Sequence, residues 1–459
     1  MGFKFKGLFS FLNYGVLSAM LMASSVGFAS VDQKDAGSIE VNAGGASNTQ
    51  DIINFSKVQK EKVITLTVDQ LKVLAEQPFS DVTVYAMEGQ KLVPIPFQFE
   101  EYSDLGFLYQ GPTKGIDPAD VGVFNKDDLL VFMLGDSGIE AEQAALAGLD
   151  LISKVQINDY DVTSYIYLIR NGEISDKQYV VYDLETGVIN ARSAKIHMNP
   201  KDLLDWGDVL PVGYNNADAP SILDSIKVRI RGSFMNIPLK LDNDNLEAKL
   251  KNVYSGPVRV TLDAEFRAVI LRIPVIRAHA QVHMDVHSAN LYVNMSTPKS
   301  YSKYLKDPYI IVAIDGNALY GGFVKTSVSG DQSFAVDGKM DESELALSGI
   351  PIDEDVSWIW LSSKEDFNII GQFDVLAQDV LIDDDVYTDV SVYYRDDKSL
   401  EDKPERFVGA LPSLGYRING MPENESTAIS YKVLFIENMN SLGAGEYLKQ
   451  LDSKPEIIM

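Results

Sequence analysis

Apolar and polar residues alternate along two long stretches in the middle of the chain. Over residues 258–270 and again over residues 275–287, the even-numbered positions are apolar and most odd-numbered positions are polar. Successive side chains of a β-strand point to opposite faces, so this period of two predicts two strands that each have one apolar and one polar face. A shorter strand is predicted over residues 290–296, and the three together predict an antiparallel meander packed on one side.

Most other apolar segments are short and end at turn residues, which is typical of strands. Pro94 and Pro96 predict an edge strand or the entry to a strand, because proline lacks the N–H that an inner strand donates. The run 128–134 is apolar on both faces and predicts a strand buried on both sides. Further strands are predicted over residues 63–68, 82–87, 92–100, 164–169, 178–182, 310–314, 357–361, 390–394 and 428–436.

A helix is predicted only over residues 438–451, so the expected fold class is mainly β. We expect antiparallel β-sandwich domains, the second of them a larger sandwich, or supersandwich, built on the long meander. The domains are predicted over residues 62–197 and 221–459, with a linker or loop over residues 198–220. Residues 30–61 are rich in Gly, Ala, Ser and Asn and predict a flexible linker.

The first 29 residues have the features of a secretory signal peptide. Lys4 and Lys6 precede a long apolar stretch, and the small residues Gly27 and Ala29 occupy the positions that a signal peptidase reads. An uncleaved anchor helix is the alternative, because the apolar stretch is longer than usual. We expect export to the periplasm or the outside of the cell, with a mature chain that begins near Ser30 and has no transmembrane span.

Composition and charge narrow the range of partners. The formal net charge is −26 at pH 7, and a surface of this sign repels the phosphates of nucleic acids and anionic lipids. A glycan or another envelope protein is the partner that we expect. The chain has no cysteine, which excludes disulfides and thiolate metal sites.

The polar face of the two long strands is the richest candidate for chemistry. A histidine paired across the strands with a carboxylate or an arginine would suit general acid/base work on a bound polymer. A solvated sheet face with cross-strand charge pairs explains the same pattern more simply. Neighbouring histidines on this face would lie roughly 13 Å apart, too far to share one metal ion. The catalytic candidates are His279, His283, Asp285, His287, Arg259 and Arg267.

Oxygen-bearing side chains also gather in the segment before the buried strand, where they could bind calcium. Their spacing does not match an EF-hand, and an ordinary acidic turn is the alternative. We expect either no cofactor or calcium, since the chain has no dinucleotide, phosphate-loop, zincin or GxSxG motif. The calcium candidates are Asp117, Asp120, Asn125, Asp127 and Asp128.

Short motifs in about a third of the chain resemble those of certain secreted bacterial β-sandwich proteins. The segments Val93-Pro94-Ile95-Pro96-Phe97-Gln98 and Asn125-Lys126-Asp127-Asp128-Leu129-Leu130-Val131-Phe132 resemble their VPFQ and DELVF strands. Gly256-Pro257-Val258-Arg259 resembles the GPVR motif of secreted proteins with a large β-supersandwich, some of them associated with glycan breakdown. The resemblance implies the fold and carries over no catalytic residue, and Asp128-Leu129 replaces the usual acidic pair.

Two functions follow from these observations. The first is an exported, non-catalytic envelope or extracellular protein with a binding or structural role, favoured because no catalytic motif is present. The alternative is a carbohydrate-active enzyme, of polysaccharide lyase or hydrolase type, that uses the His/Asp/Arg face of the long strands.

Overall fold

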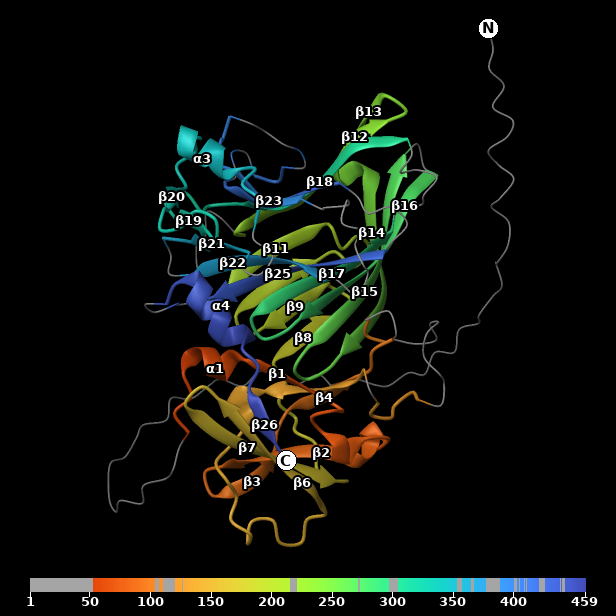
Figure 1. Cartoon of the computed structure of the whole chain (residues 1–459), viewed down its shortest axis with the longest axis vertical. Coiled ribbons are helices and arrows are strands. Elements are labelled where there is room, and N and C mark those ends of the chain that lie inside the picture. Colours follow the sequence, from red (N-terminus) through yellow and green to blue (C-terminus); the bar gives the residue numbers. More distant parts are fainter. Residues whose placement is uncertain are drawn as a thin grey trace, which may run out of the picture. The chain divides into compact units, whose positions relative to one another are not determined.

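A computed structural model describes residues 53–459, apart from several short segments (Figure 1). The segments outside the described residues are 104–106, 110–119, 126, 215–220, 271–272, 297–303, 353–356, 365–366, 377–388, 400–402, 404, 408, 410, 421–425, 438 and 440–441. The predicted signal peptide and most of the predicted linker also lie outside the described part.

Two antiparallel sheets are built mainly from residues 63–170. One has the order β1-β5-β4 and the other the order β26-β6-β7-β2-β3, so the last strand of the chain joins the first part of the sequence. The strands are β1 (Val63–Thr67), β2 (Val82–Glu88), β3 (Lys91–Pro94), β4 (Phe97–Glu100), β5 (Leu129–Met133), β6 (Leu151–Asp159), β7 (Val162–Arg170) and β26 (Glu456–Ile458).

The strand predicted to be buried on both faces is β5, the central strand of the first sheet. Leu130 and Phe132 pack into the core of the N-terminal sheets, while Val131 and Met133 pack against Val258 on the other side. The single strand predicted over residues 92–100 is wrong, because the structure has two edge strands there, β3 and β4, in different sheets. Pro94 ends β3, and Pro96 lies just before β4.

Nine strands form the largest sheet, in the order β14-β15-β16-β17-β25-β22-β21-β19-β20. The predicted meander is its first part, and every neighbouring pair in the sheet is antiparallel. The strands are β14 (Leu246–Ser255), β15 (Val260–Ile270), β16 (Ile273–Met284), β17 (Ser288–Ser296), β19 (Phe323–Thr326), β20 (Phe334–Ala335), β21 (Trp358–Ser362), β22 (Asn368–Leu376) and β25 (Ser426–Ile436).

A five-stranded and a four-stranded sheet share one apolar core with the nine-stranded sheet. The five-stranded sheet consists of β13 (Ile237–Leu241), β12 (Leu223–Phe234), β18 (Leu305–Gly316), β24 (Ser413–Asn419) and β23 (Asp389–Arg395). The four-stranded sheet consists of β11 (Trp206–Pro211), β10 (Ala194–Met198), β9 (Val188–Ala191) and β8 (Val180–Asp183). The fold is therefore mainly β and of the sandwich type, as predicted.

The period-two prediction is correct for the apolar face of the meander. Val260, Leu262 and Ala264 of β15 are buried, as are Ala280 and Val282 of β16. These side chains lie in the large core, because burying apolar surface against the opposite sheets stabilises the fold by about 25 cal/mol per Å².

The second predicted strand is too long at its C-terminal end. β16 ends at Met284, and the chain turns before β17 begins at Ser288. The carboxylate of Asp285 accepts hydrogen bonds from the backbone N–H groups of His287 and Ser288 at 3.0 and 2.7 Å. Such local bonds from an aspartate favour a turn over a continued strand, so His287 lies in the turn and not on the strand face.

Helices are few and short in the described part of the chain. The predicted C-terminal helix is α4 (Ala444–Asp452), which packs against Ile370 and Leu434 of the nine-stranded sheet. The others are α1 (Lys57–Glu61), α3 (Glu342–Leu347), and the 3-10 turns η1 (Lys72–Leu74), η2 (Phe79–Asp81), η3 (Leu134–Asp136) and η4 (Asn243–Asn245). None of the described helices has the length and apolar content needed to cross a membrane.

Two of the predicted linkers contain regular structure. α1 falls within residues 30–61, where Ser56 and Gln59 form a capping box that stabilises the first turn. β11 falls within residues 198–220 and pairs with β10. Strands β8 to β11 pack into the large core, whereas the strands before Val180 pack into the core of the N-terminal sheets. The domain ranges themselves stay a prediction.

Candidate functional site

The start of β15 is held by the edge strand β4 of the N-terminal part. Oε1 of Gln98 accepts hydrogen bonds from the backbone N–H groups of Val258 and Arg259 at 3.1 and 2.9 Å. A Cβ added at Gly256 would lie 2.0 Å from the same oxygen, so Gln98 fits only because residue 256 is glycine. The PFQ and GPVR motifs of the sequence therefore meet in space.

Arg259 and Glu100 form an ion pair at this contact. Nη1 of Arg259 lies 2.9 Å from Oε2 of Glu100, whose side chain is fully buried. Gln98 and Tyr102 also donate hydrogen bonds to the Glu100 carboxylate, at 2.7 and 3.1 Å. Burial alone would lower the pKa of Arg259, but the charge of Glu100 raises it above its usual range, so the guanidinium stays positive.

A polar cavity of about 160 Å³ lies beside this ion pair. It is formed by the turn between β16 and β17, neighbouring residues of β1, β17 and β25, and the end of α4. We call it the polar cavity. Its lining residues are Val63, Arg259, His283, Asp285, His287, Ser288, Asn290, Tyr292, Lys432, Leu451 and Asp452.

His283 is buried in the wall of the polar cavity, at 5% exposure. Its Nδ1 lies 3.2 Å from Oγ1 of Thr261, and its ring meets the Tyr292 ring edge to face at a centroid distance of 4.8 Å. Burial, together with the positive charge of Arg259, holds the pKa of His283 well below its usual range. The imidazole is therefore neutral near pH 7.

His287 is also buried, but among the described residues neither of its ring nitrogens has a hydrogen-bond partner. Its Nδ1 lies 3.7 Å from Oδ1 of Asp285, which is beyond hydrogen-bond distance. Burial lowers the pKa of His287, so this ring is also neutral near pH 7. A buried polar group without a partner costs free energy, so these nitrogens could gain from a hydrogen bond with a water or a ligand group.

The remaining groups of the polar cavity supply both donors and acceptors. Lys432 lies 3.0 Å from Asp452, and Asn290 donates to Tyr292 at 2.8 Å while it accepts from Ser430 at 2.8 Å. Nε of Arg259 is a further buried donor without a partner among the described residues.

Charge in and beside the cavity is nearly balanced. Arg259 and Lys432 are positive, while Glu100, Asp285 and Asp452 are carboxylates. Burial opposes ionisation of Asp285, but its neighbours His287 and Arg259 outweigh this effect and lower its pKa. The cavity therefore has no excess of positive charge that would select an anion.

Two of the six catalytic candidates lie elsewhere. His279 is exposed, pairs with Asp263 and lies against Phe107 at a ring distance of 4.2 Å. Arg267 forms two hydrogen bonds of 2.7 Å with Glu265 on the open part of the sheet. The polar face therefore carries solvent-exposed charge pairs at this end of the strands, whereas His283 at the other end is buried.

The calcium candidates do not form one group in the described part of the chain. Asp117 lies outside the described residues, and Asp120 and Asp127 are exposed. Asp128 is buried, and its two oxygens accept hydrogen bonds from the N–H groups of Asn125 and Tyr102 at 2.8 and 3.2 Å. Burial raises the pKa of Asp128 to about 6. Its bonds are those of a residue that closes a loop.

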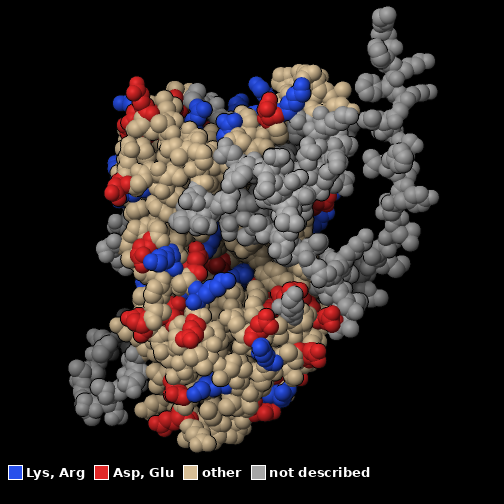
Figure 2. Space-filling model, viewed as in Figure 1, with Lys and Arg blue, Asp and Glu red and all other residues tan. Residues whose placement is uncertain are grey.

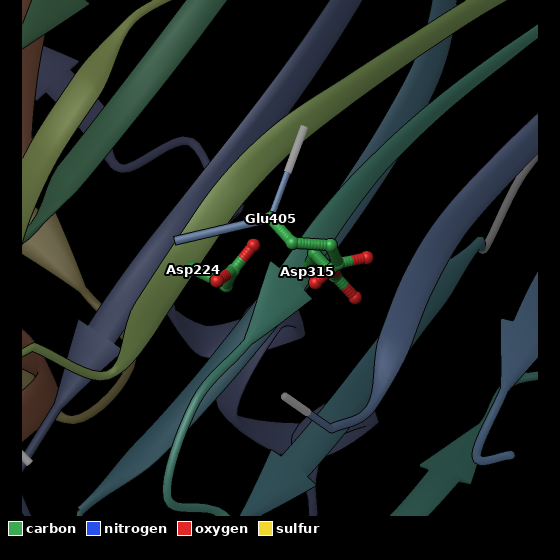
Figure 3. A group of neighbouring side chains, drawn as sticks. All are labelled: Asp224, Asp315 and Glu405. Carbon is green, nitrogen blue, oxygen red and sulfur yellow. The ribbon is translucent and has the colours of Figure 1, made fainter. Parts of the chain in front are cut away.

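An acidic cluster that sequence reasoning missed lies on the five-stranded sheet. Asp224 at the start of β12, Asp315 at the end of β18 and Glu405 bring carboxylate oxygens within 4.8 Å of one another (Figure 3). These residues are far apart in the sequence. The pairing of β12 with β18 brings Asp224 close to Asp315, and the N–H groups of Arg406 and Phe407, which donate hydrogen bonds to Asp224, hold the segment with Glu405 beside them. The signal available from sequence was an aspartate at the end of an apolar strand.

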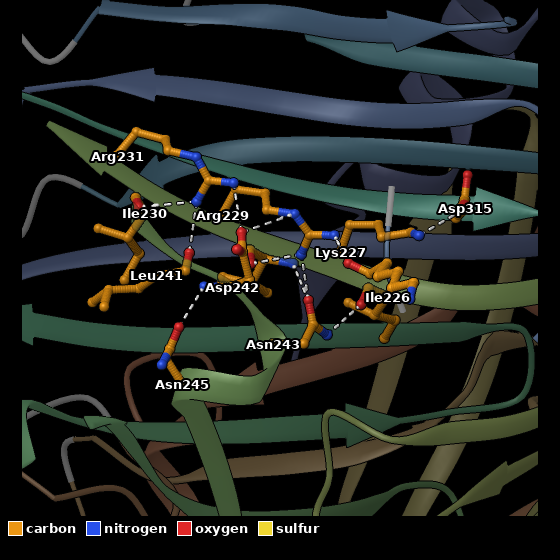
Figure 4. Close-up of polar contacts among 12 residues, drawn as sticks. Ile226, Lys227, Arg229, Ile230, Arg231, Leu241, Asp242, Asn243, Asn245 and Asp315 are labelled. Carbon is orange, nitrogen blue, oxygen red and sulfur yellow. Dashed lines mark hydrogen bonds and ion pairs between the residues drawn. The ribbon is translucent and has the colours of Figure 1, made fainter. Parts of the chain in front are cut away.

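A lysine already neutralises part of this cluster. Nζ of Lys227, buried at 2% exposure, lies 3.1 Å from Asp315 and 3.0 Å from Glu405. Arg229 and Arg231 follow it along β12 and contact Asp242 (Figure 4). The carboxylates could hold a metal ion, but the ammonium group supplies a positive charge where a cation would bind.

Among the described residues, surface charge marks no further site on the face drawn in Figure 2. There Asp and Glu are interspersed with Lys and Arg and do not form one continuous acidic patch. Charge alone therefore does not mark a docking surface on this face.

Comparison with known proteins finds similar solved structures, but no protein-family model and no curated protein matches this chain. It is similar to the structure of an alpha-mannosidase from Enterococcus faecalis V583, with 8% identity and a TM-score of 0.46, over 89% of this chain and 45% of that one. A protein in the glycosyl hydrolase family 38 from Enterococcus faecalis gives 8% identity and a TM-score of 0.44, over 89% of this chain and 47% of that one. The chain thus spans less than half the length of either, and these values say nothing about the polar cavity.

Proposed function

We propose that this chain is an exported carbohydrate-binding protein whose polar cavity receives one neutral sugar unit. The observation that carries the proposal is the polar lining of this cavity, to which His287 and Arg259 both contribute; the two ring nitrogens of His287 and Nε of Arg259 have no hydrogen-bond partner among the described residues. A neutral imidazole offers one donor and one acceptor, and Arg259 offers a second donor.

Sugar hydroxyl groups suit such a lining because each of them can donate and accept a hydrogen bond. An anion would find few free donors, since Glu100 and Asp452 already pair with Arg259 and Lys432. An apolar ligand would leave buried polar groups without partners, at a cost of about 1–3 kcal/mol each. A neutral, hydroxyl-rich ligand therefore fits best.

The size of the cavity sets the length of the ligand. At about 160 Å³, the cavity greatly exceeds the 10–15 Å³ or so that one water needs, yet it is small for a section of polysaccharide. We therefore expect the end unit of a glycan, or a free monosaccharide. The resemblance of the GPVR motif, which carries Arg259, to glycan-associated secreted proteins supports a sugar as the ligand.

The test is a binding assay with a panel of neutral and acidic sugars on the wild type, His287→Leu and His279→Leu. We expect a neutral sugar to bind, His287→Leu to abolish binding, and His279→Leu to bind as the wild type does. His287→Leu should leave stability unchanged or raise it, because it removes two unpaired buried nitrogens. Absence of binding by every sugar, or equal loss in both variants, would contradict the proposal.

A glycan-cleaving enzyme is the second candidate, and His283 favours it. Its neutral imidazole lies in the polar cavity beside a positive guanidinium, where it could accept a proton from a sugar hydroxyl. Reducing-end release and the absorbance of unsaturated products report such an activity. Turnover that His283→Gln lowers by about 10²-fold or more, with binding retained, would support catalysis; binding without turnover in the wild type would exclude it.

A further inference from the structure

Two apolar cavities lie side by side inside the large sandwich, between the nine-stranded and five-stranded sheets. Their volumes are about 130 and 60 Å³, and their walls are almost entirely apolar. The polar cavity is separate from both, since it shares no lining residue with either. The residues that line both apolar cavities are Trp206, Ile226, Val282, Leu291, Val312 and Tyr431.

The larger cavity has a local cause in the sequence. Ala264 of β15 and Ala280 of β16 are directly paired and both line it. Two small side chains side by side leave room that larger residues fill elsewhere in the core. Protein interiors are close-packed, with few voids larger than one water, so a space of this size indicates a binding site.

One residue of this apolar lining also carries a polar atom. The hydroxyl of Tyr431, a residue with 8% exposure, has no hydrogen-bond partner among the described residues. The indole N–H of Trp206, in contrast, is paired with the carbonyl of Leu203 at 2.9 Å. Among the described residues, the lining therefore combines apolar walls with one buried hydroxyl that has no partner.

We propose that these cavities bind a small apolar molecule, or an apolar group of a larger one, that carries one oxygen able to hydrogen-bond to Tyr431. A cavity of about 150 Å³ with apolar walls is known to bind benzene, so the larger cavity takes a group of about that size. This inference is independent of the proposed sugar site, because it uses different residues.

Toluene and p-cresol are the probes, since they have the same ring and methyl group and only p-cresol has a hydroxyl. Titration of the full chain, followed by the methyl resonances of its Val, Leu and Ile residues, reports binding. We expect both probes to bind the wild type, with shifts at Val282 and Leu291. In Tyr431→Phe the affinity for p-cresol should fall roughly threefold to tenfold, the effect of one lost hydrogen bond, while toluene binds unchanged.

Ala264→Leu tests the space itself, and Ala268→Leu is its matched control. Ala268 lies on the same face of β15 and is fully buried, but it lines neither cavity. Filling a real cavity leaves the Tm unchanged or raises it, whereas overpacking a filled core lowers it. We expect Ala264→Leu to keep its Tm and lose both probes, and Ala268→Leu to lose several degrees of Tm.

Three results would overturn the inference. The first is that neither probe shifts any methyl resonance of the wild type at saturating concentration. The second is that Ala264→Leu lowers the Tm as much as Ala268→Leu, which would show that the space is filled. The third is an equal loss of toluene and p-cresol in Tyr431→Phe, which would show that the hydroxyl does not contact the ligand.

Discussion

Glu100 and Arg259 are separated by 159 positions in the chain, yet their side chains form a buried ion pair of 2.9 Å. The pair joins the last residue of β4 to the segment just before β15. It also holds the Arg259 guanidinium at the edge of the polar cavity, so the same contact connects the N-terminal sheets to the candidate site.

Removing one partner of this ion pair should lower the stability of the protein. In Glu100→Gln the Arg259 charge stays buried without a counter-ion, and we expect the free energy of unfolding to fall by roughly 3–5 kcal/mol. Glu140→Gln, which breaks an exposed ion pair with Lys154, is the control and should cost less than about 1 kcal/mol. Urea unfolding measures both, and equal effects would show that the buried pair has no special role.

Gly256 should not tolerate a side chain. In Gly256→Ala the new Cβ would lie 2.0 Å from Oε1 of Gln98, and overpacking of this kind typically costs about 1–3 kcal/mol. Gly445→Ala, inside α4, meets its nearest neighbour at 3.4 Å and should stabilise by up to about 1 kcal/mol. Thermal unfolding distinguishes the two variants. If the clash with Gln98 causes the loss of stability in Gly256→Ala, adding Gln98→Ala to that variant should restore part of it.

Asp315 should contribute stability that is lost as the pH rises through the acidic range. Burial raises its pKa in the folded protein from 3.8 to about 7, so between these values the folded state holds a proton that the unfolded state has released. The free energy of unfolding then decreases with pH in this window, by at most about 4 kcal/mol from this group. Asp315→Asn should show a flatter profile than the wild type when urea unfolding is measured across the window. Parallel profiles would contradict the assignment.

Calcium should bind the acidic cluster only after Lys227 is changed. The ammonium group lies about 3 Å from two of the three carboxylates, so it repels a second cation. Calorimetry with calcium should give no heat of binding at this cluster in the wild type and a measurable one in Lys227→Gln, provided that this variant stays folded by circular dichroism. Tight calcium binding by the wild type that Asp315→Asn abolishes would contradict this prediction.

Much of the fold could be predicted from the sequence because alternation is a local signal. The even-numbered residues of β15 and β16, such as Leu262 and Val282, face the core as expected. The end of β16 could not be predicted, since Val286 and His287 continue the alternation. The turn depends on the bonds that the Asp285 carboxylate makes to the backbone, and alternation does not report these bonds.

The candidate site was only partly predictable. Four of the six named residues line the polar cavity, but the sequence did not separate them from His279 and Arg267, which have the same periodicity. The two groups of residues differ in their surroundings, because Glu100, Val63 and Asp452 cover only one end of the polar face. These three residues come from distant parts of the chain. Periodicity within one strand contains no information about such partners.

The central claim is that His283 and His287 line a sugar-binding cavity while His279 does not. The chain has four histidines, so a carbon-13 spectrum of their Cε1 positions has four signals that single substitutions assign. Titration with the neutral sugar that binds should shift the signals of His287 and His283 and leave those of His279 and His197 unchanged. Shifts at His279 or His197 alone, or no shift at His287 at saturation, would contradict the account.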